Sequence, residues 1–204
     1  MMNDNNFSEL LRPFRSLDGP LVVFDSETTD IIKDDIYPDI VTIGLIRINA
    51  DRTVSDPVEF KVRPTKLMHP LAEKVHGISD AEASTFPTIQ SQWSSIHSWL
   101  SNTTVIMHNA DFDWSIMQDH IRRYGLSQPV NVSTFCSQKN ATAWANATGV
   151  SGSWRGPSLD KLTKHFGIED RRQSLGGIHG AANDAWQTAM VVVALRNLAS
   201  PVTA

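Results

Sequence analysis

An apolar run at residues 21–24 ends in two carboxylates, Asp25 and Glu27, and this combination limits how the chain can fold. In an extended strand alternate side chains share one face, so both carboxylates are expected to point the same way. Two neighbouring carboxylates repel each other unless a cation compensates them. The segment therefore predicts a buried strand that ends at a cation site.

Two further acidic residues lie beside apolar segments later in the chain. Asp113 follows a predicted strand at 103–107 and falls in the first turns of a predicted helix, where the helix dipole tolerates a negative charge. Asp184 lies in an alanine-rich stretch that predicts a helix able to approach its neighbours closely. His179 is expected before this helix, because residues five apart on one helix would face about 140° away from each other.

Carboxylates are the ligands that Mg²⁺ and Mn²⁺ prefer. Two such ions roughly 3.5 to 4 Å apart can stabilise both the attacking and the leaving oxygen of a phosphodiester. The four carboxylates therefore predict phosphodiester hydrolysis with two divalent ions, Mg²⁺ or Mn²⁺.

Three ordered motifs make the chain resemble the DEDDh class of 3′-to-5′ exonucleases, which includes the epsilon subunit of bacterial DNA polymerase III, exonuclease X and ribonuclease T. The motifs are Asp25-Ser26-Glu27-Thr28-Thr29, then His108-Asn109-Ala110-Asp111-Phe112-Asp113, then His179 with Asp184. Weaker similarity lies in Val75-His76-Gly77-Ile78-Ser79 and in Ser158-Leu159-Asp160-Lys161-Leu162. The resemblance spans residues 21–198, and three motifs in order are far more specific than any one of them.

The resemblance implies an α/β protein with the ribonuclease H-like fold, in which helices flank a mixed central β-sheet. It implies metal ligation by Asp25, Glu27, Asp113 and Asp184, with His179 as the general base. It also implies that the terminal nucleotide contacts Thr28, Thr29, His76, Asn109 and Phe112. The expected reaction removes nucleoside 5′-monophosphates from single-stranded 3′ ends, with DNA favoured over RNA and a rate that rises with pH.

Three positions depart from the family pattern or leave it ambiguous. Asp30 and Thr42 stand where many relatives have glycine and glutamate, and these changes affect the expected shape of the substrate pocket. Asp111 lies two residues from Asp113, and the motif spacing favours Asp113 as the ligand and a surface or capping role for Asp111.

Alternative functions stay open at this point. One is an RNA-trimming exoribonuclease of the same family, and another is a nucleic-acid-binding module without turnover. A third is a metal-dependent phosphoesterase that acts on small nucleotides. The presence of all four presumed ligands together with the histidine disfavours an inactive module.

Length and composition agree with one catalytic domain. The chain has 204 residues, of which 41% are hydrophobic, as is usual for one soluble domain. We expect an exonuclease domain at residues 21–200 after an N-terminal extension at 1–20.

The single cysteine, Cys136, excludes an internal disulfide and is typical of a reducing compartment. No apolar run reaches the ~20 residues of a membrane span, so a cytoplasmic location without membrane contact is expected. A polymerase partner is not indicated, because the short tail after the last predicted helix leaves little room for a polymerase-binding segment. The oligomeric state is not determined.

The net charge of −4 is unusual for a protein that binds nucleic acid, but the charges are unevenly distributed. Residues 1–60 contain 12 acidic and 5 basic side chains, whereas residues 61–204 contain 10 acidic and 13 basic ones. Basic residues that could contact a strand near its end are Arg155, Lys161, Lys164, Arg171 and Arg172.

The remaining pattern alternates strands and helices. We expect strands at 21–24, 40–48, 54–62, 103–107 and 130–135. We expect helices at 71–75, 89–100, 113–124 and 137–147, and another after Ser158 as its N-cap.

Overall fold

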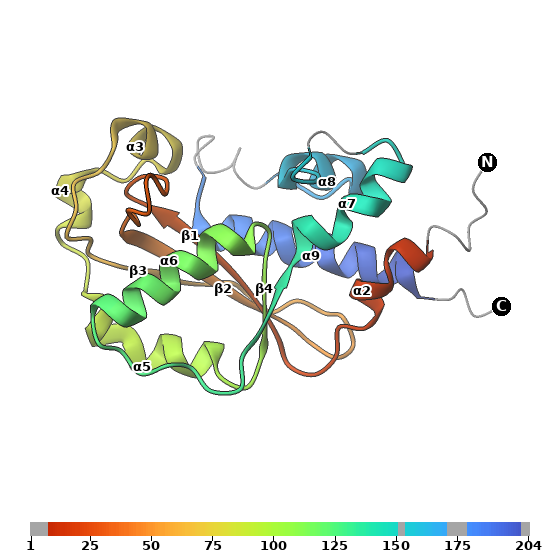
Figure 1. Cartoon of the computed structure of the whole chain (residues 1–204), viewed down its shortest axis with the longest axis horizontal. Helices are drawn as coiled ribbons and strands as arrows, with labels where there is room; N and C mark the ends of the chain where they lie inside the picture. Colours follow the sequence, from red (N-terminus) through yellow and green to blue (C-terminus); the bar gives the residue numbers. More distant parts are fainter. Residues whose placement is uncertain (1–7, 151–153, 171–178, 201–204) are drawn as a thin grey trace.

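The centre of the molecule is a five-stranded sheet in the computed structural model, which describes residues 8–150, 154–170 and 179–200 (Figure 1). The strands are β1 (Leu21–Thr28), β2 (Ile40–Ile48), β3 (Val58–Lys61), β4 (Thr104–Met107) and β5 (Ser133–Cys136), in the spatial order β3-β2-β1-β4-β5. β2 runs antiparallel to β1 and β3, whereas β4 runs parallel to β1 and β5. The predicted α/β class with a mixed sheet is confirmed.

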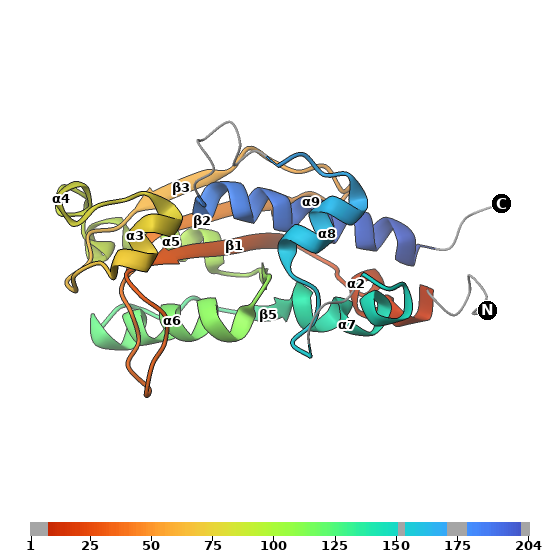
Figure 2. The same ribbon diagram turned by 90° about the horizontal axis from the view of Figure 1, so that it is seen from above.

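Helices cover both faces of this sheet (Figure 2). The helices with known bounds are α2 (Arg12–Arg15), α3 (Pro70–His76), α4 (Asp80–Ala83), α5 (Ile89–Leu100), α6 (Ala110–Arg123), α7 (Ser137–Ala147), α8 (Leu159–Phe166) and α9 (Ala181–Ala199). Alternate residues of β1 pack into two different cores. Leu21 and Val23 belong to the core with α9, whereas Val22 and Phe24 belong to the core with α5 and α6. This alternation is the reason for a continuous apolar run, since both faces are buried.

Gly44 of β2 lets the first turn of α9 lie directly on the sheet. A Cβ atom on Gly44 would lie 2.1 Å from the carbonyl oxygen of Ala181 and 2.5 Å from the backbone nitrogen of Ala182. No other residue type fits this approach without a backbone shift. The alanines on α9 permit the same closeness further along, because Ala185 and Ala189 are fully buried.

Several element bounds differ from the sequence prediction. The third strand is limited to β3, and before it only Val54 forms an isolated bridge, with Ile48. Pro57 has no N–H group to donate to a ladder, which explains the interruption. α6 begins at Ala110 rather than at Asp113. The sequence pattern did not predict the short helices α2 and α4.

The segment before β1 packs on the main core. Leu11 and Phe14 are 1% and 0% exposed, and the ring centroids of Phe14 and Phe135 lie 5.2 Å apart. The core therefore extends back to Leu11, into the predicted N-terminal extension at 1–20, while β1 begins at Leu21.

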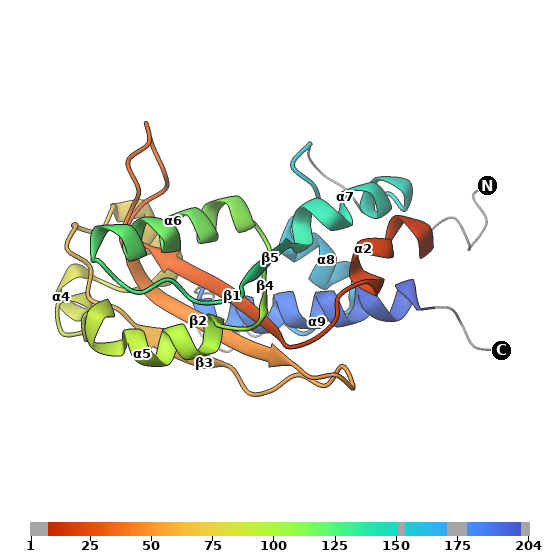
Figure 3. The same ribbon diagram turned by 60° about the horizontal axis from the view of Figure 1, so that its bottom comes forward.

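The connection between β1 and β2 projects from the body beside α6 (Figure 3). Its base is closed by Thr29 N–H, which donates to the Asp39 carbonyl at 2.8 Å, and by Asp39 N–H, which donates to Thr29 Oγ1 at 3.0 Å. Its tip turns at Asp34 and Asp35, whose φ angles are 49° and 60°. Ile31 and Ile36 on this connection are mostly exposed.

Within the described ranges, no helix has the length and apolar character needed to cross a membrane.

Candidate active site

The site begins at the end of β1. This strand continues to Thr28, so Asp25 and Glu27 extend the row of Leu21 and Val23 on the face that α9 covers. Both carboxylates are partly buried at the point where the apolar row ends.

Asp113 reaches the same place from the other face. It lies in the first turn of α6 and is 5% exposed. Ser26, between the two β1 carboxylates, donates a hydrogen bond from Oγ to Asp113 Oδ1 at 2.7 Å. Ser26 therefore orients Asp113 toward the acidic pair, although the sequence analysis gave Ser26 no role.

Asp184 and His179 come from the start of α9. His179 precedes the helix, as predicted, and its backbone N–H donates to the Val75 carbonyl at 3.0 Å. Its Nδ1 lies 3.0 Å from Asp184 Oδ2, and Asn183 Nδ2 donates to Asp184 Oδ1 at 3.2 Å. Since a carboxylate only accepts, a hydrogen bond between these two atoms requires a proton on Nδ1. The glycines at 176 and 177 lie outside the described residues.

Burial raises the pKa values of three of these carboxylates, and neighbouring charges raise two of them further. Burial raises the pKa of Asp25 well above its ordinary value, and the charges of Asp113, Asp184 and Glu27 raise it further. Burial and the charges of Asp184 and Asp113 raise the pKa of Glu27 to about 8. Burial also raises the pKa of Asp113 to about 7, despite the opposing hydrogen bond from Ser26.

This arrangement fits divalent cations. One ligand atom from each of Glu27, His179 and Asp184 lies within 4.8 Å of the other two. Among the described residues, the charged groups that most perturb Asp25 are three other carboxylates, all of which raise its pKa. A cluster of oxygen ligands that repel one another is what a hard dication stabilises.

We call Asp25, Glu27, Asp113 and Asp184 the acidic cluster. A cavity of about 510 Å³ lies beside it. Its lining comes from the end of β1, the projecting connection, α3 and α6: Ser26, Glu27, Thr28, Asp30, Ile31, Lys33, His69, Leu71, Ala72, Val75, His76 and Phe112. The cavity is mostly apolar in its walls and opens next to the carboxylates, and we call it the terminal pocket. Its volume is within the range of small-molecule sites.

The predicted substrate residues divide into three groups. Thr28, His76 and Phe112 line the terminal pocket. Thr29 is 1% exposed and its hydroxyl accepts from Asp39 N–H, so it closes the base of the projecting connection instead. Asn109 lines a different cavity, described below.

The structure also shows where Asp30 and Thr42, which depart from the family pattern, and the ambiguous Asp111 lie. Asp30 lines the terminal pocket and forms an ion pair with Lys33 at 3.0 Å. Thr42 lies opposite Glu27 on β2. Asp111 is exposed and pairs with Lys139 at 2.6 Å, so the geometry places Asp113, and not Asp111, in the acidic cluster.

His108, which the second motif contains, has a structural contact that the sequence did not reveal. Its Nε2 lies 3.1 Å from the Pro157 carbonyl, and its Nδ1 lies 3.0 Å from Ser137 Oγ. Burial lowers the pKa of His108 to about 4. The neutral ring therefore donates from Nε2 to Pro157 and fixes the chain at residue 157 against the motif.

Comparison with known proteins identifies relatives of this chain. The exonuclease family of the ribonuclease T type matches residues 22–192. The DNA polymerase III subunit epsilon of Pasteurella multocida (strain Pm70) is 25% identical over 167 residues, which are 80% of this chain and 63% of that protein. The chain thus spans less than two thirds of this relative's length.

Solved structures share the fold. Escherichia coli exonuclease I in complex with a dT13 oligonucleotide superimposes with a TM-score of 0.70 at 22% identity, covering 88% of this chain and 41% of that one. Exonuclease X in complex with 5′ overhanging duplex DNA gives a TM-score of 0.62 at 23% identity, covering 87% of this chain and 91% of that one. The fold is therefore ribonuclease H-like, and the chain belongs to the ribonuclease T-type exonuclease family, as its resemblance to the DEDDh 3′-to-5′ exonucleases predicted.

Proposed function

We propose that this protein is a metal-dependent exonuclease that removes nucleoside 5′-monophosphates from the 3′ end of single-stranded DNA. The observation that carries the proposal is the convergence of Asp25, Glu27, Asp113 and Asp184, together with His179, beside a pocket large enough for a nucleotide. Membership of an exonuclease family supports it.

Asp25, Glu27, Asp113 and Asp184 would bind two divalent ions, Mg²⁺ or Mn²⁺. When bound, these ions would supply positive charge to the attacking and the leaving oxygen of the phosphodiester. Ser26 contributes by orienting Asp113, and Asn183 contributes by orienting Asp184.

His179 is the residue that we assign as general base. Its contact with Asp184 keeps the ring beside the carboxylates. A neutral ring that is protonated on Nδ1 carries its lone pair on Nε2, the atom that would take the proton of the attacking water. The backbone contact with Val75 ties this segment to α3, which forms a wall of the terminal pocket.

The terminal pocket would bind the last nucleotide. Phe112 offers an aromatic face on which any base can stack, which suits removal of nucleotides without sequence preference. His76 accepts from Ile78 N–H through Nδ1, and burial lowers the pKa of His76, so the ring is neutral with its proton on Nε2. Thr28 directly follows Glu27 at the end of β1 and lines the same pocket.

The test is digestion of 5′-labelled oligonucleotides. Matched DNA and RNA strands, single- and double-stranded, would be incubated with Mg²⁺, Mn²⁺ or EDTA, beside an Asp25→Asn control. The proposal predicts a ladder that shortens stepwise from the 3′ end of single-stranded DNA, with release of 5′-monophosphates, and no reaction in EDTA or in the control.

Other outcomes identify the alternatives. Faster shortening of RNA would indicate an RNA-trimming exoribonuclease. Binding without shortening in any metal would indicate a module without turnover. An intact strand alongside hydrolysis of free nucleotides would indicate a small-nucleotide phosphoesterase.

A further inference from the structure

A second cavity, of about 570 Å³, adjoins the terminal pocket. Its lining comes from the projecting connection, the starts of α6 and α7, and a turn that follows residue 153: Ile32, Asn109, Asp111, Phe112, Gln138, Lys139, Thr142, Trp154 and Arg155. We call it the upstream pocket. None of the carboxylates of the acidic cluster lines it.

The two pockets share a wall. Phe112 lines both of them, and the adjacent residues Ile31 and Ile32 line the terminal and the upstream pocket respectively. A strand whose last nucleotide occupies the terminal pocket can therefore continue into the upstream pocket past Phe112.

The upstream pocket carries an exposed aromatic ring and two cations. Trp154 is 87% exposed, although burial is the ordinary state of an indole in a folded domain. The Arg155 guanidinium lies over this ring at 5.0 Å from its centroid. Lys139 pairs with Asp111 across the solvent-exposed rim. Such exposed ion pairs are weak, so a phosphate can compete for Lys139.

The turn that presents Trp154 is seated firmly on α7. A Cβ atom on Gly156, whose φ is +104°, would lie 2.4 Å from Thr142 Oγ1 and 2.9 Å from the Gln138 carbonyl oxygen. The next residue, Pro157, accepts hydrogen bonds from His108 and from Gln138 Nε2, the latter at 3.3 Å. His108 belongs to the same motif as Asp113, so the Trp154 turn and the acidic cluster are fixed to one segment.

We propose that the upstream pocket is a second nucleotide subsite, in which Trp154 stacks on a base upstream of the 3′-terminal nucleotide while Arg155 and Lys139 contact the strand's phosphates. One face of the indole carries Arg155, and the base stacks on the other. Aromatic stacking combined with basic groups is how single strands are bound without sequence preference. This inference rests on the proposed function, because that function puts the strand end in the terminal pocket.

The experiment compares substrates of different reach. The p-nitrophenyl ester of thymidine 5′-monophosphate enters only the terminal pocket, whereas a dT10 strand reaches both pockets. Steady-state rates with Mn²⁺ on both substrates, and anisotropy of labelled dT10 with Ca²⁺ for binding, would be measured for the parent chain and for Trp154→Ala, Trp154→Phe, Arg155→Ala and Asp111→Asn. Arg63→Ala removes an exposed arginine that follows β3, at the opposite edge of the sheet, and serves as the charge control.

Trp154→Ala is expected to weaken dT10 binding and to raise the KM for dT10 about fivefold or more. The steady-state rate on the ester should not change. Trp154→Phe keeps an aromatic ring and is expected to retain most of the parent's binding. Arg155→Ala is expected to weaken binding and to reduce the salt slope of dT10 binding by about 0.7. Asp111→Asn is expected to tighten binding, because it releases Lys139 from its ion pair. Arg63→Ala should resemble the parent.

Failure of this inference differs from failure of the proposed function. If the parent shortens dT10 while Trp154→Ala and Arg155→Ala match it on both substrates and in binding, the subsite is wrong and the exonuclease proposal stands. If the parent binds dT10 through Trp154 but hydrolyses neither substrate, the subsite stands and the proposed function is wrong. Equal losses on the ester and on dT10 would show that Trp154 acts on the fold, against the subsite.

Discussion

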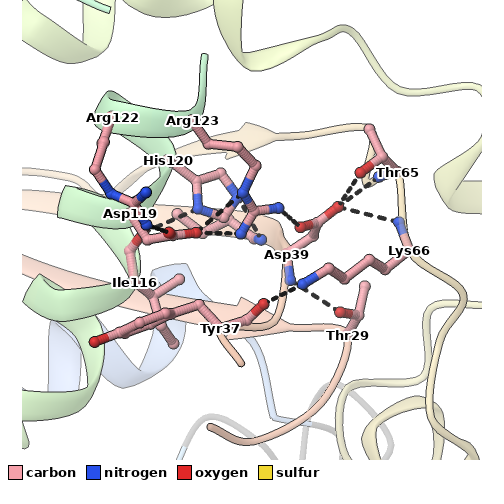
Figure 4. Close-up of polar contacts among 11 residues, drawn as sticks. Thr29, Tyr37, Asp39, Thr65, Lys66, Ile116, Asp119, His120, Arg122 and Arg123 are labelled. Atoms are coloured by element: carbon pink, nitrogen blue, oxygen red, sulfur yellow. Dashed lines mark hydrogen bonds and ion pairs between the residues drawn. The ribbon is translucent and has the colours of Figure 1, made fainter. Parts of the chain in front are cut away.

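Two groups of buried carboxylates in this molecule are compensated in opposite ways. In the acidic cluster, Asp25 is surrounded by other carboxylates and its pKa is raised. At the far end of α6, Asp39 is fully buried, yet its pKa is lowered, because hydrogen bonds from Thr65 and the charge and hydrogen bond of Arg123 outweigh the effect of burial (Figure 4).

The second group supplies its own positive charge. Arg123 forms ion pairs with both Asp39 and Asp119. Asp39 Oδ2 also accepts from Thr65 N–H and Oγ1 at 2.6 and 2.7 Å, and from Lys66 N–H at 3.0 Å. His120 completes the group, because its Nε2 accepts from Ile40 N–H at 3.1 Å. We call this set the Asp39 cluster.

The difference separates a structural role from a functional one. The Asp39 cluster ties the start of β2, the end of α6 and the chain before α3 together without any external group. The acidic cluster contains the same type of side chain, buried at Asp113 and Asp184 and partly buried at Asp25 and Glu27. Among the described residues, the charges that most affect Asp25 are those of other carboxylates. Groups whose pKa values are shifted by burial and by like charges are typical of functional sites.

The sharpest test of this contrast is Asp25→Asn. We expect it to reduce strand shortening on the order of a thousandfold or more, as for other residues that act as part of a catalytic unit. In the metal-free protein at pH 8 it should raise the melting temperature, since it removes repulsion from Glu27, Asp113 and Asp184. Activity assays and thermal melts in EDTA measure both. A lower melting temperature in EDTA would contradict the assignment of uncompensated charge.

The same substitution in the Asp39 cluster should act in the opposite direction. Asp39→Asn leaves the partly buried Arg123 without one of its two carboxylates. Breaking a buried ion pair from one side costs about 3 kcal/mol. Urea unfolding should show this loss with and without Mn²⁺. A variant as stable as the parent would show that the Asp39 cluster contributes little to the fold.

The two clusters also predict opposite pH slopes for the metal-free protein. The pKa values of Glu27 and Asp113 are raised to about 8 and about 7, so between about pH 4 and 8 the folded state binds more protons than the unfolded chain. Stability should therefore fall as the pH rises through this window. The contribution of Asp39, whose pKa is lowered, is present above its unfolded pKa of about 4 and is lost as the pH falls further.

Urea unfolding in EDTA from pH 5 to 8.5 measures the first slope. Addition of Mn²⁺ should flatten it, because a bound dication stabilises the ionised carboxylates. A stability that rises steadily to pH 8.5 without metal would contradict the raised pKa values.

The smallest expected effect is on metal affinity, and it concerns the Ser26 hydroxyl, which contacts Asp113. Ser26→Ala removes the hydrogen bond that lowers the pKa of Asp113, so the carboxyl becomes harder to ionise. Loss of a group that orients a metal ligand typically lowers metal affinity 10- to 100-fold, and we expect about tenfold here. Calorimetric titration with Mn²⁺ measures it. Ser115→Ala on α6, where the hydroxyl donates to the Phe112 carbonyl, is the matched control and should bind as the parent does.

The sequence predicted the elements that carry the site and the residues that converge there. It did so because strand and helix periods are local properties, and because the resemblance of three ordered motifs to the exonuclease family implies which carboxylates act together. Asp25 and Glu27 share a face because alternate residues of a strand point the same way. His179 precedes α9, as predicted from the angle of about 140° that would separate it from Asp184 on one helix. The predicted strand bounds were wrong where a single residue interrupts the hydrogen bonding between strands, as Pro57 does before β3.

The tertiary structure alone decided which side chains the pocket receives. Thr29 and Thr28 are neighbours in one motif, yet only Thr28 lines the terminal pocket, because Asp39 takes the Thr29 hydroxyl. Gly44 matters because Ala181, which is 137 positions further along the chain, comes into contact with it. Trp154 forms a pocket with α6 and α7 only once Gly156 packs on α7. Contacts between distant segments depend on how whole elements pack, which no local pattern encodes.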